Sequence, residues 1–200
     1  LAALDSGAVT MGYRIYDPGF YQLEGEKHKY RDWKRGGHGS KISLYDAIVQ
    51  SCDVYFYDVG FRMGIDVLHD YGARFGYGHR TGVDLPAEAR GIMPSRDWKQ
   101  GARGRVWYPG DTINVSIGQG FMLATPLQMA VAVSRLATRG EVREPKLVSA
   151  VGSSVVSPLL QPPKIEIPAR YWDLVLDAMA GVVRDLRGTA RRAVGKIDYT

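Results

Sequence analysis

The stretch SCDVYFY, residues 51–57, interrupts two helical patterns and puts polar side chains at the interruption. Before it, the capping-box pattern that begins at Ser43 predicts a helix over residues 44–50. After it, a second helical pattern begins. Polar side chains at such a break face either a cleft or the inside of a turn. Ser51 and Asp53 are therefore candidate site residues. The alternative is that they only cap the second helix, because both residue types favour that position.

Outward from this break the sequence is rich in helical patterns, with few strands and long loops between them. Residues 8–42 show no sustained periodicity, and a loop of that length is usually functional. Thr125 followed by Pro126 is a strong helix start, and an apolar face at helical spacing continues toward Gly140. The other expected elements are helices over 67–75, around Trp98, over 169–184 and from Thr189, extended segments over 112–117 and 146–151, and a linker over 158–168.

Composition limits the class of protein. The chain has 200 residues, 45% of them hydrophobic, and a net charge of +5, which predicts one globular domain or most of one. Basic residues gather between Lys27 and Lys41, but no zinc-finger, helix-turn-helix or RNP pattern accompanies them, so no nucleic-acid partner is expected. The single cysteine cannot form an internal disulfide. There is no apolar run near 18 residues and no signal peptide, so a membrane anchor is expected outside this chain.

Several common catalytic motifs are absent from the sequence. It contains no GxSxG, HExxH, CxxC or Walker loop. The segment GQG at 118–120 is too short for a dinucleotide fingerprint and predicts a tight turn. The chemistry of the chain must therefore be sought at the break near residue 51.

Eight short segments, in order and with ordinary spacing, look like the landmarks of one enzyme family. They are YRDWK (30–34), GHG (37–39), SCD (51–53), FGYG (75–78), TGVDL (81–85), GDT (110–112), GQG (118–120) and TPLQM (125–129). Each is weak alone. Together they are strong evidence: over its whole length the chain resembles the class B, elongation-type penicillin-binding proteins.

The resemblance implies an α/β (α+β) fold, the penicillin-binding or serine β-lactamase-like transpeptidase fold, in which helices cover an antiparallel sheet. This chain would supply mostly the helical part, with long structured loops. The family uses three motifs: Ser-x-x-Lys, Ser-x-Asn/Asp and Lys-Thr/Ser-Gly. Only the middle one is present, at residues 51–53. The others are expected before Leu1 and after Thr200, so residues 1–200 would form a partial transpeptidase domain that is inactive alone.

The reaction implied is D,D-transpeptidation during cell elongation. A serine attacks the D-Ala-D-Ala end of a peptidoglycan stem peptide, D-Ala leaves, and the acyl group passes from the serine to the amine of a second stem. β-Lactams acylate the same serine. A serine needs a neighbouring base, which in this family is the lysine of the first motif. Ser51 would relay a proton within that network toward the departing amine. Asp53 would orient the network and accept from the amide side of the bound peptide or β-lactam.

A second group of candidates combines the only cysteine with one histidine and two carboxylates: Asp17, Asp32, His38 and Cys52. Around an extended break, Ser51 and Asp53 point to one side and Cys52 to the other, so Cys52 can face the preceding loop. One thiolate, one imidazole and two carboxylates suit a tetrahedral Zn²⁺. The ion would be structural, and no organic cofactor is implied. The alternatives are a small buried hydrophobe at Cys52 and a turn cap at Asp17.

The resemblance also implies a location and partners. The family works at the periplasmic face of the bacterial inner membrane, beside a SEDS-type glycosyltransferase and other proteins of the elongation complex. Two alternatives stay open. The first is a β-lactam sensor or β-lactamase of the same fold, which a deacylation assay on the complete domain would separate. The second is a non-catalytic scaffold module, which absence of the two other motifs from the flanking sequence would favour.

Overall fold

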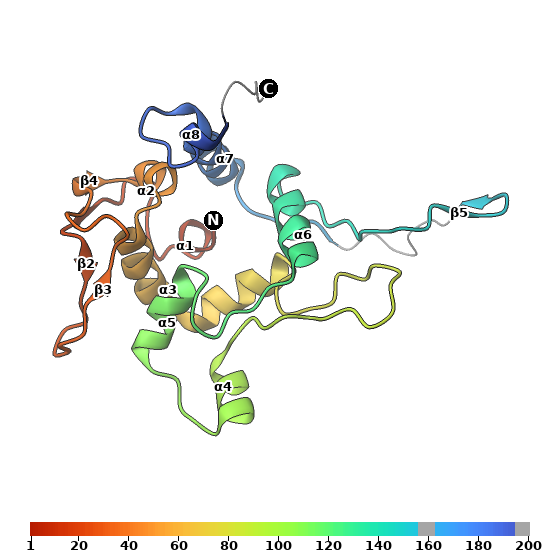
Figure 1. Ribbon diagram of the computed structural model, residues 1–200, viewed down its shortest axis with the longest axis horizontal. Helices are drawn as coiled ribbons and strands as arrows, with labels where there is room; N and C mark the ends of the chain where they lie inside the picture. Colours follow the sequence, from red (N-terminus) through yellow and green to blue (C-terminus); the bar gives the residue numbers. More distant parts are fainter. Residues whose placement is uncertain (156–162, 195–200) are drawn as a thin grey trace.

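The computed structural model describes residues 1–155 and 163–194, and it is dominated by helices (Figure 1). The two longest begin at residues 53 and 169. In chain order the helices are α1 (Ala2–Asp5), α2 (Leu44–Gln50), α3 (Asp53–Arg74), α4 (Arg96–Arg103), α5 (Pro109–Ser116), α6 (Pro126–Ala137), α7 (Ala169–Arg184) and α8 (Arg191–Val194). None of the described helices is both long and apolar enough to cross a bilayer.

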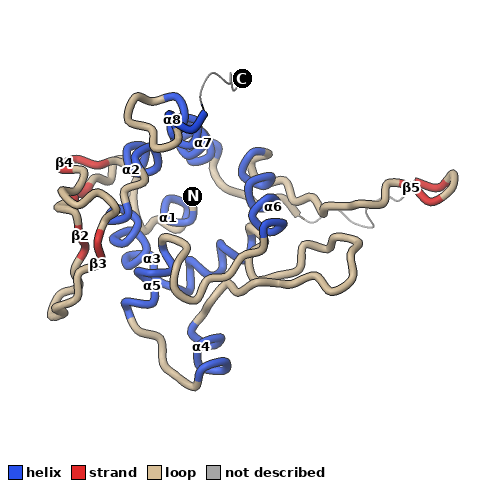
Figure 2. The backbone as a smooth tube through the Cα atoms, in the orientation of Figure 1, coloured by secondary structure: helices blue, strands red, loops and turns tan. Residues whose placement is uncertain are grey.

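Strands are short and form three separate two-stranded antiparallel sheets within the described residues (Figure 2). The first pairs β1 (Ile15–Asp17) with β4 (Gly39–Ile42), and the second pairs β2 (Phe20–Tyr21) with β3 (Tyr30–Arg31). The third, β5 (Ala150–Val151) with β6 (Ser154–Val155), is a hairpin that projects from the rest of the molecule. The long N-terminal loop is thus an ordered segment folded over the start of α3.

The core lies where α2, α3, α5 and α7 meet. Helix α2 packs against α7, and α3 packs against α5. Side chains with no exposed surface sit at these contacts, among them Ala47 and Val49 on α2, Tyr55 on α3 and Ile113 on α5. The four helices therefore hold the junction between α2 and α3, residues 51–52, on a packed base.

Local sequence signals gave most of the helices correctly. Helix α2 has the predicted bounds and the capping box at Ser43, and α7 covers the predicted residues 169–184. Ser95 caps the helix that contains Trp98, and Thr125 caps α6. The predicted helix over 67–75 is the second half of α3, because Gly64, at φ 78° and ψ 164°, breaks the helical geometry between its two halves.

Other expectations were wrong or shifted. Residues 112–117 were expected to be extended, yet most of them belong to helix α5: Pro109 stands in its first turn and the Asp111 carboxylate accepts from the backbone N–H of Tyr108. Of the segment 146–151, only residues 150–151 are a strand, since the N–H groups of residues 147 and 148 donate to Asp84. The helix expected from Thr189 begins at Arg191. Residues 158–162 of the expected linker lie outside the described residues.

Candidate active site

The junction between α2 and α3 is a one-residue left-handed turn. Ser51 ends α2 at φ 55° and ψ 48°, and the N–H of Cys52 donates to the carbonyl of Ala47 at 2.9 Å. Helix α3 then begins at Asp53. As predicted, the side chains alternate: Ser51 is exposed and Cys52 is completely buried. The left-handed conformation strains a residue with a Cβ by about 1–2 kcal/mol, so glycine is the usual choice there.

Replacing Ser51 with glycine should therefore raise stability while it lowers activity. In the complete protein we expect Ser51→Gly to increase the free energy of unfolding by up to about 1 kcal/mol, because glycine relieves the left-handed strain. The same variant loses the hydroxyl and should be acylated more slowly by a fluorescent penicillin. Denaturant melts and single-turnover labelling measure the two effects separately. A variant that is stabilised and still labels at the wild-type rate would show that the serine is not kept for chemistry.

Ser51 lies in the wall of a cavity of about 710 Å³. The cavity is bounded on one side by Trp33, Lys34, His38 and Gln50, and on the other by residues 186–189 and 191–192. The Oγ of Ser51 is 3.0 Å from the Oγ1 of Thr189. No local sequence pattern marks Thr189 as a site residue, and it lies 138 residues away from Ser51 along the chain.

Asp53 faces the loop before β4. Its Oδ2 accepts the backbone N–H of Trp33 at 3.0 Å, and the Trp33 indole in turn donates to the Gln50 carbonyl at 3.2 Å. Burial raises the pKa of the Asp53 carboxyl; the Trp33 N–H offsets part of this effect, and the Asp32 charge adds to it. The carboxyl therefore anchors the loop against the turn that carries Ser51.

The start of α3 is not capped by either candidate catalytic residue. Cys52 holds the N-cap position without a side-chain cap bond. Instead, Oδ2 of Asp32 accepts the N–H of Val54, in the first turn, at 3.2 Å. Asp32 supplies that contact, so the predicted alternative, a side-chain cap on this helix from Ser51 or Asp53, is not what the structure shows.

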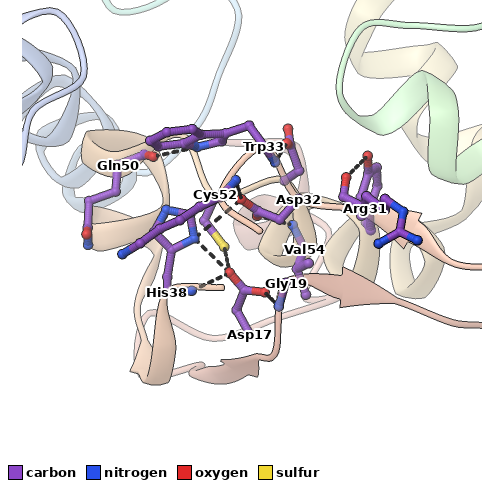
Figure 3. A network of polar contacts seen from close by, with 12 residues as sticks. Asp17, Gly19, Arg31, Asp32, Trp33, His38, Gln50, Cys52 and Val54 are labelled. Carbon is purple, nitrogen blue, oxygen red and sulfur yellow. Dashed lines mark hydrogen bonds and ion pairs between the residues drawn. The ribbon is translucent and has the colours of Figure 1, made fainter. Parts of the chain in front are cut away.

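Asp17, Asp32, His38 and Cys52 converge behind this turn, as predicted (Figure 3). One potential ligand atom from each residue lies within 4.8 Å of the other three. The two small sheets bring them together: Asp17 ends β1, His38 directly precedes its partner strand β4, and Asp32 directly follows β3. Gly37, at φ 69°, lets the chain pass close to Asp17, where a Cβ would stand 2.2 Å from the Asp17 carbonyl oxygen.

Three of the four residues share hydrogen bonds through Asp17. Its Oδ2 accepts from the backbone N–H of His38 at 2.7 Å, lies 2.7 Å from the His38 Nδ1, and accepts from the Cys52 thiol at 3.5 Å. Asp32 Oδ1 lies 3.6 Å from the same Nδ1. The other ring nitrogen, Nε2, is buried and has no hydrogen-bond partner among the described residues.

The cluster holds more negative than positive charge. Asp17 and Asp32 are 1% and 5% exposed, and within the described part of the chain no lysine or arginine forms an ion pair with either. Burial by itself raises the pKa of Asp17, but hydrogen bonds from Gly19 and His38 outweigh it and hold this pKa below the ordinary value. Burial and the nearby carboxylates raise the pKa of the Cys52 thiol. Burying two carboxylates beside a single imidazole costs folding free energy unless a cation is bound.

The donor set fits a zinc ion better than other common metals. Thiolate and imidazole are ligands that Zn²⁺ prefers, whereas Ca²⁺ and Mg²⁺ take oxygen alone. Ligands of a tetrahedral zinc at its usual bond lengths lie roughly 3.3–3.7 Å apart. The separations of 3.5 Å from the Cys52 Sγ to the Asp17 Oδ2 and 3.6 Å from the His38 Nδ1 to the Asp32 Oδ1 agree with that spacing. The 2.7 Å between the His38 Nδ1 and the Asp17 Oδ2 is a hydrogen-bond distance, which a bound ion would have to lengthen. The turn cap predicted as an alternative for Asp17 is also present, since its Oδ1 accepts the Gly19 N–H at 2.6 Å.

The fold and these residues define the class of protein. The family described as "Penicillin binding protein transpeptidase domain" matches residues 1–200, and the chain belongs to it. The resemblance predicted from the eight sequence segments and the predicted fold are thereby confirmed. Residues 51–53 have the form Ser-x-Asp that is expected for the middle motif of that family.

Within this family, the chain is similar to several individual proteins. The chain is 41% identical over 203 residues to "Peptidoglycan D,D-transpeptidase MrdA" of Escherichia coli (strain K12). The matched region covers all of this chain and 32% of the relative. A crystal structure of Pseudomonas aeruginosa PBP2 in complex with WCK 5153 is 43% identical with a TM-score of 0.94, over 99% of this chain and 45% of that one. A complex between PBP2 and MreC from Helicobacter pylori is 33% identical with a TM-score of 0.83, over 100% of this chain and 38% of that one. The chain thus spans about a third of the curated relative.

Proposed function

We propose that the protein carrying this chain is a peptidoglycan D,D-transpeptidase. It acts on the D-Ala-D-Ala ends of stem peptides through an acyl-serine intermediate during cell elongation, and β-lactams acylate the same serine. The observation that carries this proposal is Ser51, a strained, exposed serine in a cavity wall, at the middle motif of a transpeptidase domain. The likeness to a protein named peptidoglycan D,D-transpeptidase supports the reaction, and the elongation role rests on the resemblance of the eight sequence segments.

In the proposed reaction the nucleophilic serine comes from the Ser-x-x-Lys motif, which this sequence does not contain. That serine loses its proton to the motif's lysine and bonds to the D-Ala carbonyl carbon; the C–N bond to the terminal D-Ala breaks, and a proton goes to the departing amine. Ser51 would pass that proton within the lysine–serine network. Asp53 would orient the network by holding the Trp33 backbone beside the cavity, and would accept from the amide side of the bound ligand.

We further propose that Asp17, Asp32, His38 and Cys52 bind one structural Zn²⁺. The ion would neutralise the buried carboxylates and tie the loop of residues 17–38 to the start of α3. Its effect on acylation would be indirect: the same junction carries Ser51 on its opposite face. No organic cofactor enters this proposal.

Location and partners follow from the relatives and stay proposals for this protein. We place the domain at the periplasmic face of the bacterial inner membrane, anchored by a segment outside this chain. The Helicobacter pylori PBP2 that resembles this chain forms a complex with MreC. We therefore expect an MreC-like protein, a SEDS-type glycosyltransferase and other elongation proteins as partners, with stem peptides and β-lactams as ligands.

A labelling experiment tests the proposed function. The complete protein should react with a fluorescent penicillin in a stoichiometric, hydrolysis-resistant bond. The 200-residue chain alone should stay unlabelled, because no serine in it is followed three residues later by lysine. Labelling of the chain alone would place the nucleophile within it and contradict the proposal. Rapid turnover of the acyl-enzyme of the complete protein would favour a β-lactamase, and no acylation of that protein would favour a scaffold module.

A further inference from the structure

The turn that follows α7 meets the middle motif from across the cavity. Thr189 in this turn places its Oγ1 3.0 Å from the Oγ of Ser51. Its backbone N–H donates to the carbonyl of Val49, in the last turn of α2, at 3.2 Å. Among the described residues, Thr189 is the one hydrogen-bond partner of the Ser51 hydroxyl. The contact joins a residue of the motif to a segment that carries none of the family's three motifs.

The position of this turn does not depend on the threonine hydroxyl. Helix α7 lies directly on α2, since a Cβ at Gly181 would stand 2.7 Å from both the Tyr45 hydroxyl and a methyl of Val49. Arg187, two residues before Thr189, forms an ion pair of 2.8 Å with Asp46 in the first turn of α2. Backbone packing and this ion pair therefore bring the hydroxyl to Ser51.

The direction of the Ser51 O–H matters for a proton relay. A hydroxyl has one donor and two acceptor positions, and an exposed one rotates freely unless a partner fixes it. When Thr189 donates to Ser51 Oγ, one lone pair of that oxygen is occupied. The O–H and the other lone pair of Ser51 are then left for the cavity, where the substrate and the lysine of the first motif would meet it. In this arrangement Thr189 only donates a hydrogen bond, and its own proton is not transferred in the reaction.

We propose that Thr189 is a positioning residue for acyl transfer, which orients the Ser51 hydroxyl toward the reacting groups. The proposal rests on the proposed relay role of Ser51. Because both hydroxyls are exposed, their hydrogen bond adds little to the stability of the fold. The contact should therefore be visible in the rate of acylation and almost invisible in the melting temperature.

The test uses the complete protein with Thr189→Val, which replaces the hydroxyl with a methyl group of similar size. Single-turnover labelling with a fluorescent penicillin gives the limiting acylation rate constant and the affinity of the preceding non-covalent complex. We expect the rate constant to fall about three- to tenfold, the range that one hydrogen bond between neutral groups supplies. The affinity and the melting temperature should not change measurably.

Two further variants separate orientation from packing. Thr189→Ser keeps the hydroxyl and should recover the rate to within about twofold of wild type. Thr138→Val is the matched control, since the Thr138 hydroxyl donates to carbonyl groups on and just after its own helix, away from the cavity. If Thr189→Ser were as slow as Thr189→Val, a hydroxyl at this position would not be enough to restore the rate. The packing of the whole threonine side chain would then be responsible, and the proposal would be wrong.

A double variant distinguishes failure of this inference from failure of the proposed function. If Thr189 acts through Ser51, Thr189→Val should slow a Ser51→Ala protein no further, because the two effects are not additive. A slow Ser51→Ala protein beside a Thr189→Val protein at the wild-type rate would overturn the positioning role alone. Wild-type rates in both single variants would overturn the relay role of Ser51, and the positioning role with it.

Discussion

Cys52→Ser should abolish zinc binding and lower the melting temperature of the complete protein by roughly 10 °C. A hydroxyl is a far weaker zinc ligand than a thiolate. A ligand that binds only the native state stabilises it by about 4 kcal/mol when its free concentration is a thousand times its dissociation constant. In a domain of this size that corresponds to roughly 8–16 °C. Elemental analysis should find about one zinc per wild-type chain and almost none in the variant.

Chelation provides the same test without a mutation. A strong chelator should lower the melting temperature of the wild-type protein and leave that of Cys52→Ser unchanged. Acylation by penicillin should fall in both cases, although Cys52 is completely buried and does not line the cavity. The reason is that the loop bound by Asp17 and Asp32 also supplies the Trp33 backbone contact to Asp53.

Carboxylate variants control for the general effect of losing a charge or burying a new polar group. Asp17→Asn keeps the size of the side chain and the acceptor for the Gly19 N–H, but should lose zinc. Asp66→Asn removes a carboxylate that is 68% exposed and pairs with Arg96, so it should retain zinc and the wild-type melting temperature. A wild-type protein that is purified free of metal, and melts at the same temperature with and without chelator, would contradict the zinc site.

Local sequence was sufficient for several helices. Helix α2 was predicted from its capping box, and α7 from an amphipathic pattern long enough to leave no competing strand. Helix α5 was missed because residues 112–117 alternate between polar and apolar and look extended, while the signals for a helix, Pro109 and Asp111, lie before them. Short segments are ambiguous in this way because one or two turns show too little of either period.

Some features of the candidate site could likewise be predicted from the sequence, and others could not. An extended break predicted that Ser51 and Cys52 face opposite ways, and the structure does have Ser51 exposed and Cys52 buried. The expected cause was wrong, because Ser51 has a left-handed and not an extended backbone. The left-handed backbone of Ser51 could not be read from the sequence, since glycine is the residue that signals it. Thr189 was also out of reach, because its contact with Ser51 depends on how α7 packs on α2 and on no local pattern.

The second prediction with a large expected effect concerns the acylation rate of a Ser51 variant. Ser51→Ala in the complete protein should lower the rate of acylation at least about tenfold, which corresponds to roughly 1.4 kcal/mol of barrier. The physical reason is the lost hydroxyl in the path of the proton to the departing amine. Stability should change little, because Ser51 is exposed and its hydrogen bond to Thr189 joins two exposed side chains.

Matched measurements exclude indirect causes. Ser134→Ala, on the exposed face of α6, removes a serine hydroxyl far along the chain from the motif and should leave acylation unchanged. Ser51→Ala should still contain about one zinc, since the Ser51 hydroxyl hydrogen-bonds to Thr189 and not to any of the four proposed zinc ligands. A slow variant with wild-type zinc content and melting temperature is then slow for a chemical reason.

The most direct test of the account is the second-order rate constant for acylation of the complete protein by a fluorescent penicillin, with wild type and Ser51→Ala compared at equal zinc content. The proposed role of the middle motif predicts a rate constant at least about tenfold lower for Ser51→Ala. Equal rate constants would contradict it, and Ser51 would then be only the residue that ends α2.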